Sequence, residues 1–288
     1  MSASKRIDLT DIAGVVVLYN PDDQFFENIK TYLHQVDKLY VVDNSDKPAI
    51  NVSQYIGQIS KIHYINNEDN KGVAYALNVA AQAAIKDGYS HLLTMDDDSK
   101  APVDMVESMI SFHNKYPYSN KLGIISVSHS KPLKHVEYKK VLFTMTSGNI
   151  VNLHAYQKVG AYNEKLFIDH VDHEFGIRLN LLDYEIIEIA DVKLNHRLGT
   201  SKSIYLLGYK YNFVSHSPLR LYYFTRNGLY IINSYVFSAP FFCMKILKLV
   251  IIESLKSFLL DDDKKNRFIY LIKAIRDALS KNLGKINV

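Results

Sequence analysis

Residues 91–100 read HLLTMDDDSK, and the fold of the chain can be predicted outward from this stretch. Four mostly apolar residues, 92–95, run straight into Asp96, Asp97 and Asp98. A short apolar run that ends in turn-forming residues predicts a buried β-strand. In open α/β sheets ligands bind beyond the carboxyl ends of the strands, so three carboxylates at this point form a candidate binding site.

The three aspartates also indicate a divalent cation. Two unit charges roughly 4 Å apart interact by about 4 kcal/mol at an effective dielectric constant near 20, so ionised carboxylates repel one another unless a cation lies among them. Carboxylate oxygens are hard ligands that suit Mg²⁺ or Mn²⁺. The alternative is a solvated acidic turn that caps a helix after Pro102, and this stretch alone does not decide between the two.

The residues before this stretch predict an open sheet. Apolar runs predict strands at residues 14–19, 38–42 and 62–65, while residues 24–36 and 74–84 have helical patterns. Strands that alternate with helices at this spacing predict parallel pairing with right-handed crossovers. The fold class is therefore α/β, with a Rossmann-like, mostly parallel central sheet flanked by helices.

Polar residues lie at or just past the ends of the predicted strands. They are Tyr19 and Asn20, then Asp43 and Asn44, and then Asn70, Lys71 and Gly72 before the alanine-rich helix. A helix amino terminus is a natural place for a phosphate group. Each cluster alone resembles an ordinary polar loop, but their shared sheet edge predicts a nucleotide site. The motifs GxGxxG and GxxxxGK[ST] are absent from the expected places, which disfavours a dinucleotide-binding fold and a P-loop phosphotransferase.

The pattern changes after Pro117. Residues 123–127 predict another strand, and residues 141–151 alternate like two paired strands around Ser147-Gly148-Asn149. Residues 192–201 predict a short strand followed by His196. A lone histidine is most often a structural hydrogen-bonding group, so the residues themselves give no metal role to this one.

Residues 166–186 have apolar side chains at helical spacing, with Asp169, Asp172 and Glu174 near the start. Carboxylates there are stabilised by the positive end of the helix dipole. The cluster is therefore either structural or the source of a catalytic base.

Residues 219–232 carry Arg220 and Arg226 among aromatic residues. They are either snorkelling arginines of a packed helix, or guanidinium groups placed near a diphosphate or acceptor phosphate.

The last fifty residues differ from the rest in charge. Residues 239–288 hold ten Lys or Arg and five Asp or Glu, whereas the remainder is nearly neutral. A neutral body with a basic, apolar tail argues against a nucleic-acid domain and indicates a membrane surface or a partner. Asp261, Asp262 and Asp263 are predicted to cap a helix before a second basic helix at 267–281. The apolar stripe of the first tail helix is Met244, Leu247, Ile251, Leu255 and Phe258.

The composition fits one large domain with an appendage. The chain has 288 residues, of which 48% are hydrophobic, enough for a sizeable core. The single cysteine, Cys243, excludes a disulfide framework and a cysteine-based zinc site. The start, MSASKRIDLTDIAG, lacks the apolar core of a signal peptide, and no long charge-free apolar stretch predicts a transmembrane helix. We therefore expect a cytoplasmic protein.

The chain carries, in order, VVVLYNP, VVDNS, NKGVAYALN, a strand ending in DDD, SGN, LFIDHVDHEFGIR, HRLG and RLYYFTRN. This series resembles glycosyltransferase family two with the GT-A fold, over residues 14–230. It is most similar to the rhamnosyltransferase branch, with galactofuranosyltransferases as near relatives. Many members of that branch have Asp-Gln-Asp-Ser where this chain has DDDS at 96–99, so both outer aspartates are kept.

The resemblance implies a role for each matching residue. Asp172 would be the general base, and Asp169 would orient the sugar or acceptor. Asp43 would accept from the imide N–H of thymine or uracil. The residues implied to contact the nucleotide are Tyr19, Asn20, Asp43, Asn44, Lys71, Gly72, Asp96 and Asp97. The ligands implied for Mn²⁺ or Mg²⁺ at the donor diphosphate are Asp96, Asp98 and His196.

Together these features predict an inverting, metal-dependent glycosyltransferase for bacterial surface polysaccharide such as O-antigen or capsule. The expected donor is dTDP-L-rhamnose, with UDP-galactofuranose or another UDP-hexose as alternatives. The expected acceptor is a polyprenyl-diphosphate-linked glycan at the cytoplasmic membrane face, which the tail would contact unless it packs on the body or forms a homodimer. Residues 1–234 would be catalytic, divided at 120/121 into nucleotide and acceptor halves, and residues 235–288 would form the tail.

Two other functions fit less well. A sugar-nucleotide pyrophosphorylase would require a glycine-rich loop after the first strand, where this chain has LYNPDD. A catalytically inactive homologue that acts as an assembly partner would be indicated by loss of a site residue, yet Asp96, Asp98, Asp172 and His196 are all present.

Overall fold

The computed structural model describes residues 6–47, 52, 56, 59–129, 136–196, 200–206 and 209–286. The chain divides into two compact units. The first unit is Met1–Glu164 with Asp172–His196, and the second is Lys165–Val171 with Arg197–Val288. The boundary predicted after residue 234 lies inside this second unit.

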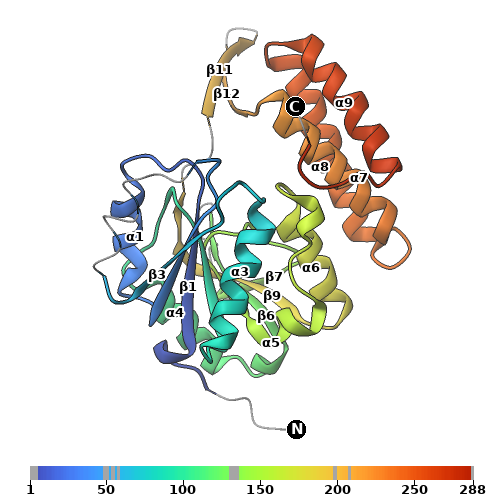
Figure 1. Cartoon of the computed structure of the whole chain (residues 1–288). Coiled ribbons are helices and arrows are strands. Elements are labelled where there is room, and N and C mark those ends of the chain that lie inside the picture. Colours follow the sequence, from blue (N-terminus) through green and yellow to red (C-terminus); the bar gives the residue numbers. More distant parts are fainter. Residues whose placement is uncertain are drawn as a thin grey trace. The chain divides into compact units, whose positions relative to one another are not determined.

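The first unit is built on an eight-stranded sheet within the described residues, in the order β3-β2-β1-β4-β8-β6-β9-β7 (Figure 1). The strands β3, β2, β1 and β4 are parallel, as are β6 and β9, while β8 and β7 are antiparallel to their neighbours. The predicted mostly parallel α/β sheet is confirmed. Its strands are β1 (Ile12–Leu18), β2 (Lys38–Asp43), β3 (Ile62–Asn66), β4 (His91–Asp96), β6 (Leu122–Ser128), β7 (Tyr138–Val141), β8 (Asn149–Asn152) and β9 (Glu185–Lys193).

Helices cover both faces of this sheet (Figure 1). Val16, Val41 and Leu93 pack with α1 and α4 in one core, while the alternate residues Val15 and Val42 are buried under the other face. Burial on both faces explains why these strands are continuous apolar runs. The helices are α1 (Phe25–Leu33), α3 (Val73–Lys86), α4 (Met105–Lys115), α5 (Leu153–Val159) and α6 (Val171–Leu181). Three-residue 3₁₀ turns occupy Leu9–Asp11, Ser119–Lys121 and Glu164–Leu166, and a small ribbon pairs β5 (Ser99–Lys100) with β10 (Asn195–His196).

One prediction for the second half is wrong in detail and another is confirmed. Residues 141–151 do not form a strand pair in the described sheet, because β7 pairs with β9 whereas β8 lies between β4 and β6. Alternation identifies a strand but not its partner. The helical spacing predicted from Val171 onward is confirmed by α6 (Val171–Leu181), whereas Phe167, Asp169 and His170, which precede this helix, have φ angles of 65°, 61° and 61°. Those left-handed values are incompatible with an α-helix.

The second unit contains an antiparallel ribbon and three helices among its described residues. They are β11 (Thr200–Leu206), β12 (Tyr209–Ser215), α7 (Pro218–Tyr235), α8 (Pro240–Leu260) and α9 (Lys264–Leu279). Helix α7 packs against both α8 and α9, and its start is capped by Ser217, whose hydroxyl accepts from the Arg220 N–H. Among the described helices, none is both long enough and apolar enough to cross a membrane.

The acidic triplet between α8 and α9 does not cap a helix with its side chains as predicted. Asp263 occupies the N-cap position of α9, but with a left-handed φ of 55° and no side-chain cap hydrogen bond. Asp261 is buried, accepts a hydrogen bond from the Ser215 hydroxyl, and lies 3.5 Å from the Arg267 guanidinium. The Asp261 carboxylate therefore serves as a buried counterion that joins β12 to α9.

Candidate active site

The predicted polar clusters share one edge of the sheet. Strand β1 lies between β2 and β4, with Leu18 opposite Asp43 and Val17 opposite Asp96. Because these three strands are parallel, the residues that follow them leave the sheet at the same edge. The aspartates that end β2 and β4 therefore flank the end of β1 on its two sides.

Asn44 ties the loop before α3 to the end of β2. Its Oδ1 accepts from Asn67 Nδ2 and from the Lys71 N–H, both at 3.1 Å, and its Nδ2 donates to Asn70 Oδ1. Asn70 Oδ1 also accepts from the Gly72 N–H. Gly72 precedes the first turn of α3 with a φ of 91°, which favours glycine. These contacts make Asn44 the residue that fixes Lys71 and the start of α3.

Asp43 is buried, with both carboxylate oxygens engaged. Oδ1 accepts from the Ser45 N–H at 3.0 Å, and Oδ2 accepts from the Tyr64 hydroxyl at 2.8 Å. Burial first, and then the hydrogen bond to Asp43 and the Asp43 charge, raise the pKa of Tyr64. Each carboxylate oxygen offers two lone pairs, so Asp43 can accept a further hydrogen bond from a ligand.

The end of β1 is bound to both neighbouring clusters. The Tyr19 N–H donates to the Asp97 carboxylate, and the half-exposed Tyr19 hydroxyl donates to Asp46 at 3.0 Å. The Asn20 N–H donates to Ser45 Oγ at 2.8 Å. These hydrogen bonds place Tyr19 and Asn20 between Asp43 and the three aspartates.

The three aspartates concentrate negative charge. Burial first, and then the charges of Asp98 and Asp96, raise the pKa of Asp97 to about 7, against a lowering by the Tyr19 N–H. Burial first, and then the charges of Asp97, Asp96 and Asp98, raise the pKa of Tyr32 on α1. A divalent cation among these carboxylates would relieve the repulsion, and carboxylate oxygens are the ligands that a hard metal ion prefers.

Helix α1 supports this cluster through residues that the sequence analysis missed. Asn28 Nδ2 donates to the Asp97 carbonyl at 2.7 Å, while the buried Asn28 Oδ1 and Tyr32 hydroxyl have no hydrogen-bond partner among the described residues. Asn28 and Tyr32 are four residues apart and lie on the buried face of α1. Two polar groups on an otherwise apolar face were the signal that could have found them.

The Ser147-Gly148-Asn149 motif supports the cluster from the other side. The Asp96 N–H donates to Ser147 Oγ at 3.1 Å, and Ser147 Oγ lies 2.8 Å from Ser99 Oγ. The Gly148 N–H donates to the Thr94 carbonyl, and a Cβ on Gly148 would lie 2.7 Å from a Val127 methyl. Glycine thus lets the motif pack closely against β6 while its N–H binds the carbonyl of Thr94 on β4.

The described residues show only part of the predicted metal site. The β5–β10 pairing sets His196 opposite Ser99, which follows Asp98 in the chain. The side chain of His196 and residues 197–199 of the HRLG motif lie outside the described parts. Among the described side chains no group of three His, Cys, Asp or Glu could hold a metal. The set of Asp96, Asp98 and His196 stays a prediction.

The three acids near the start of α6 have different surroundings. Glu174 forms an ion pair of 2.7 Å with Arg178, and its side chain is only 3% exposed. Asp169 belongs to the second unit and lies 3.4 Å from the Arg220 guanidinium. Asp172, in the first unit, is the one acid of the three without an arginine partner among the described residues, and 24% of its side chain is exposed.

Arg226 has neither of the two predicted environments. Its residue exposure is 0%, so the side chain does not snorkel. The guanidinium donates to the carbonyls of Gly284 at 2.8 Å and Leu166 at 3.3 Å, and lies near the rings of Tyr222 and Tyr223. Its donors are used inside the second unit and do not face a phosphate.

Comparison with known proteins provides independent information. The family model described as glycosyl transferase family 2 matches residues 15–170. The dTDP-rhamnosyl transferase RfbF of Shigella flexneri is 26% identical over 245 residues, which cover 78% of this chain and 80% of RfbF.

The crystal structure of S. aureus TarS is similar with a TM-score of 0.60 at 14% identity, over 93% of this chain and 48% of TarS. This chain thus spans about half of that longer protein. A structure of TarS 1–349 in complex with UDP-GlcNAc gives 0.60 at 13% identity, over 93% and 80% of the two chains.

The match to the family model covers more than half of the chain, and the sheet and helices described above are those of GT-A glycosyltransferases. The chain therefore belongs to glycosyl transferase family 2 and is a glycosyltransferase.

Proposed function

We propose that this glycosyltransferase transfers L-rhamnose from dTDP-L-rhamnose with inversion, and that it requires Mg²⁺ or Mn²⁺. The observation that carries this proposal is the concentration of three carboxylates at the end of β4, beside the buried Asp43 at the end of β2. Similarity to RfbF favours rhamnose as the donor sugar. UDP-galactofuranose or another UDP-hexose is the second candidate, because TarS 1–349 has been crystallised with UDP-GlcNAc and with UDP.

The nucleotide would lie along the edge formed by β1, β2 and α3. Asp43 would accept from the imide N–H of thymine, a group that uracil shares. Tyr19, Asn20 and Asn44 would border the base. Lys71, whose ammonium lies 5.2 Å from the Tyr75 ring, and Gly72 would border the phosphates at the start of α3.

Asp96, Asp98 and His196 would hold the metal ion, and Asp97 would remain beside it as a hydrogen-bonded support. When bound, a divalent ion stabilises the negative charge on the leaving diphosphate as a Lewis acid. Asp172 would take the proton from the acceptor hydroxyl as that oxygen attacks the anomeric carbon. One base and one direct displacement give inversion, and Asp169 would orient the sugar or acceptor.

Binding of a panel of dTDP, UDP, GDP, CDP and ADP by calorimetry, with and without Mn²⁺, tests the donor site. Metal-dependent binding of dTDP or UDP should be lost in Asp98→Ala and kept in Asp104→Ala. Asp104 is a suitable control because it is an exposed aspartate whose side chain makes no cap hydrogen bond at α4. Absence of binding by any diphosphate would overturn the proposal.

Turnover of dTDP-L-rhamnose and UDP-hexoses then identifies the sugar. Asp172→Asn should retain nucleotide binding and lose turnover by roughly 10²- to 10⁴-fold, the usual contribution of a general base. Retained turnover in Asp172→Asn would refute its role as the base without affecting the donor site.

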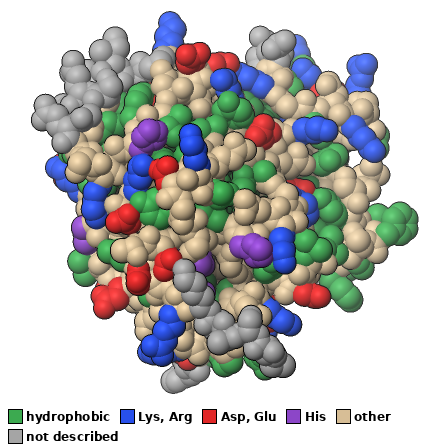
Figure 2. Space-filling model, turned by 60° about the horizontal axis from the view of Figure 1, so that its bottom comes forward, with side chains coloured by type: hydrophobic (Ala, Val, Ile, Leu, Met, Phe, Trp, Pro, Cys, Tyr) green, Lys and Arg blue, Asp and Glu red, His purple; other side chains and the backbone are tan. Residues whose placement is uncertain are grey.

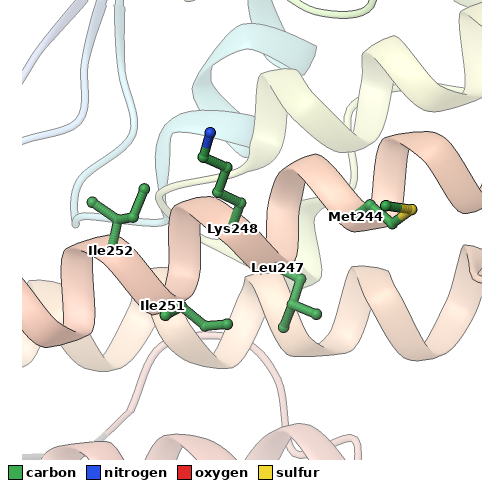
Figure 3. A pocket seen from close by; sticks show the side chains of 5 residues that line it. All are labelled: Met244, Leu247, Lys248, Ile251 and Ile252. Carbon is green, nitrogen blue, oxygen red and sulfur yellow. The ribbon is translucent and has the colours of Figure 1, made fainter.

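We further propose that the acceptor is a polyprenyl-diphosphate-linked glycan of a bacterial surface polysaccharide, at the cytoplasmic membrane face. The apolar stripe of α8 supports this, because its five residues, Met244, Leu247, Ile251, Leu255 and Phe258, are 42% to 65% exposed. A hollow on α8 is lined by apolar side chains and Lys248, whose ammonium extends away from Leu247 and Ile251 (Figure 3). Apolar side chains with lysines suit an anionic lipid surface.

Cosedimentation with phosphatidylglycerol-containing vesicles tests the membrane contact. Ile251→Glu with Leu255→Glu should abolish sedimentation, whereas Leu182→Glu, at an exposed leucine of the first unit, should not. Equal sedimentation of all variants would refute the membrane role. Loss of a homodimer in the double variant would assign the stripe to a second copy instead.

No nucleic-acid partner is proposed, and acidic and basic side chains are interspersed on the face that Figure 2 shows.

A further inference from the structure

We propose that segment 282–286, here called the strap, and the buried neighbours Arg226 and Asn227 form a positioning device for residues 165–171, here called the acid loop. The acid loop carries Asp169 and leads directly into α6 and Asp172. The inference rests on the proposed function only where it assigns Asp169 and Asp172 to the acceptor reaction. All groups of the device belong to the second unit.

The acid loop needs support from outside its own residues. Phe167, Asp169 and His170 are not glycine, yet their φ angles of 65°, 61° and 61° lie in the left-handed region. A residue with a side chain has a strained backbone at such φ angles. A segment keeps these angles only where its surroundings impose them. Three such residues within four positions predict a loop that relaxes once its contacts are removed.

Asn227 on α7 supplies the main support. Its Nδ2 donates to the carbonyls of Leu166 at 2.8 Å, Ile168 at 2.7 Å and Asp169 at 3.1 Å. One side-chain amide thus binds the residue before the left-handed stretch and two residues inside it. These three bonds require that the NH₂ group, and not the carbonyl oxygen, faces the acid loop.

Arg226 sets that orientation. Its Nε donates to Asn227 Oδ1 at 2.9 Å, which turns the Asn227 NH₂ group toward the loop. Its Nη2 donates to the Leu166 carbonyl at 3.3 Å, and its Nη1 donates to the Gly284 carbonyl at 2.8 Å. Arg226 therefore connects the acid loop, the amide that holds it and the strap.

The strap adds further hydrogen bonds and apolar contacts to the device. The Gly284 N–H donates to the Lys165 carbonyl at 2.7 Å, and the Ile286 N–H donates to the Tyr223 hydroxyl at 3.0 Å. Ile286 also packs against the apolar cluster that contains Phe167. Gly284 has a φ of 91°, and its two backbone groups bind the first residue of the acid loop and the guanidinium of Arg226.

The consequence for the reaction follows from chain connectivity. The acid loop joins the first unit at Glu164 and at Asp172, so a change in its path alters Asp169 and the entry into α6. Asp43, Lys71 and the aspartates of β4 are not part of the device. Loosening the acid loop should therefore lower kcat and leave donor binding intact.

The variant Asn227→Asp tests this, since it keeps the shape of the side chain and replaces the NH₂ donor with an acceptor. The matched control is Asn233→Asp, the same change at an exposed position of the same helix. Hydrogen exchange should accelerate at least tenfold at amides of the acid loop in Asn227→Asp only. In that variant kcat should fall at least tenfold, with the donor KM within about twofold of wild type.

If exchange in Asn227→Asp accelerates at the amides of α8 as strongly as at those of the acid loop, the whole second unit has opened. A variant without residues 283–288 then tests whether the strap holds the acid loop. It should accelerate exchange in the acid loop, leave α8 protected and lower kcat. Unchanged exchange in the acid loop in that variant would overturn the device, and faster exchange with an unchanged kcat would overturn its positioning role. Exchange is measured without substrate, so an error in the proposed donor or base does not affect that readout.

Discussion

The side-chain amide of Asn28 donates a hydrogen bond of 2.7 Å to the carbonyl of Asp97, which lies 69 residues further along the chain. This contact links α1 to the turn that follows β4. It acts on the backbone of the middle aspartate, so α1 can position the outer carboxylates without binding either of them.

Replacement of Asn28 by alanine should weaken the site. The Asp97 carbonyl would lose its donor, which we expect to lower the free energy of unfolding by about 1–2 kcal/mol and the affinity for a nucleoside diphosphate severalfold. Denaturation and calorimetry measure the two effects. Lys30→Ala, in the same helix but at a half-exposed side chain, should change neither. Wild-type affinity in Asn28→Ala would show that the contact does not position the aspartates.

Removal of the Tyr32 hydroxyl should stabilise the protein, whereas removal of the Tyr40 hydroxyl should destabilise it. The buried Tyr32 hydroxyl has no hydrogen-bond partner among the described residues, so Tyr32→Phe should raise the free energy of unfolding by about 1 kcal/mol. The Tyr40 hydroxyl donates to Asp87 at 2.6 Å, so Tyr40→Phe should lower it. Urea denaturation compares them, and a loss of stability in Tyr32→Phe would point to a partner that the contacts above do not contain.

Acid should destabilise the fold through buried histidines. Burial lowers the pKa of His113, against smaller raising effects of Asn114 and Asp11. The unfolded chain binds a proton near pH 6.5, whereas the folded chain binds it only at lower pH. The stabilisation is therefore complete above about pH 6.5 and is lost as the pH falls toward the folded pKa, at no more than about 1.4 kcal/mol per pH unit for one group.

His113→Phe should reduce this slope, and denaturation at about pH 7.5 and about pH 5.5 measures it. Burial also lowers the pKa of His173 and His216, so a smaller slope of the same sign should remain. Identical slopes for the variant and the wild type would mean that His113 does not contribute.

Gly228 allows α7 and α8 to pack closely. A Cβ at this position would lie 2.4 Å from a Val250 methyl and 3.2 Å from His170 Nε2. Gly228→Ala should therefore destabilise the second unit by about 1–3 kcal/mol through overpacking. Ser234→Ala, at an exposed position of the same helix, should have little effect. Thermal unfolding of both variants checks this, and equal midpoints would mean that the two helices can move apart at low cost.

The sheet edge could be predicted closely from the sequence because its strands are buried on both faces. The strand predicted at residues 38–42 is found at Lys38–Asp43. Its bounds could be predicted because polar residues follow the apolar run at the point where the strand ends. Partner choice could not be predicted in the same way. Val141 pairs with Ile186 of β9, and this depends on contacts between distant parts of the chain.

The supports of the site were harder to predict than its acids. Three adjacent aspartates stand out in any sequence, whereas Asn28 acts only because α1 packs with one face toward β4. Arg226 was misread because a cation in a helix normally reaches solvent. Backbone carbonyls of Leu166 and Gly284, which no side-chain pattern reveals, satisfy it instead.

The division of the second unit into two stretches of chain has a consequence for protein synthesis. Leu166 is separated from Arg226 by 60 residues, and Arg226 from Gly284 by a further 58. At roughly 5–20 residues per second, the acid loop leaves the ribosome several seconds before its last partner exists. The strands of the first unit are by then complete, so a nascent chain would acquire its proposed nucleotide site early. If the strap positions the acid loop as proposed, sugar transfer would reach its full rate only after the strap has been made.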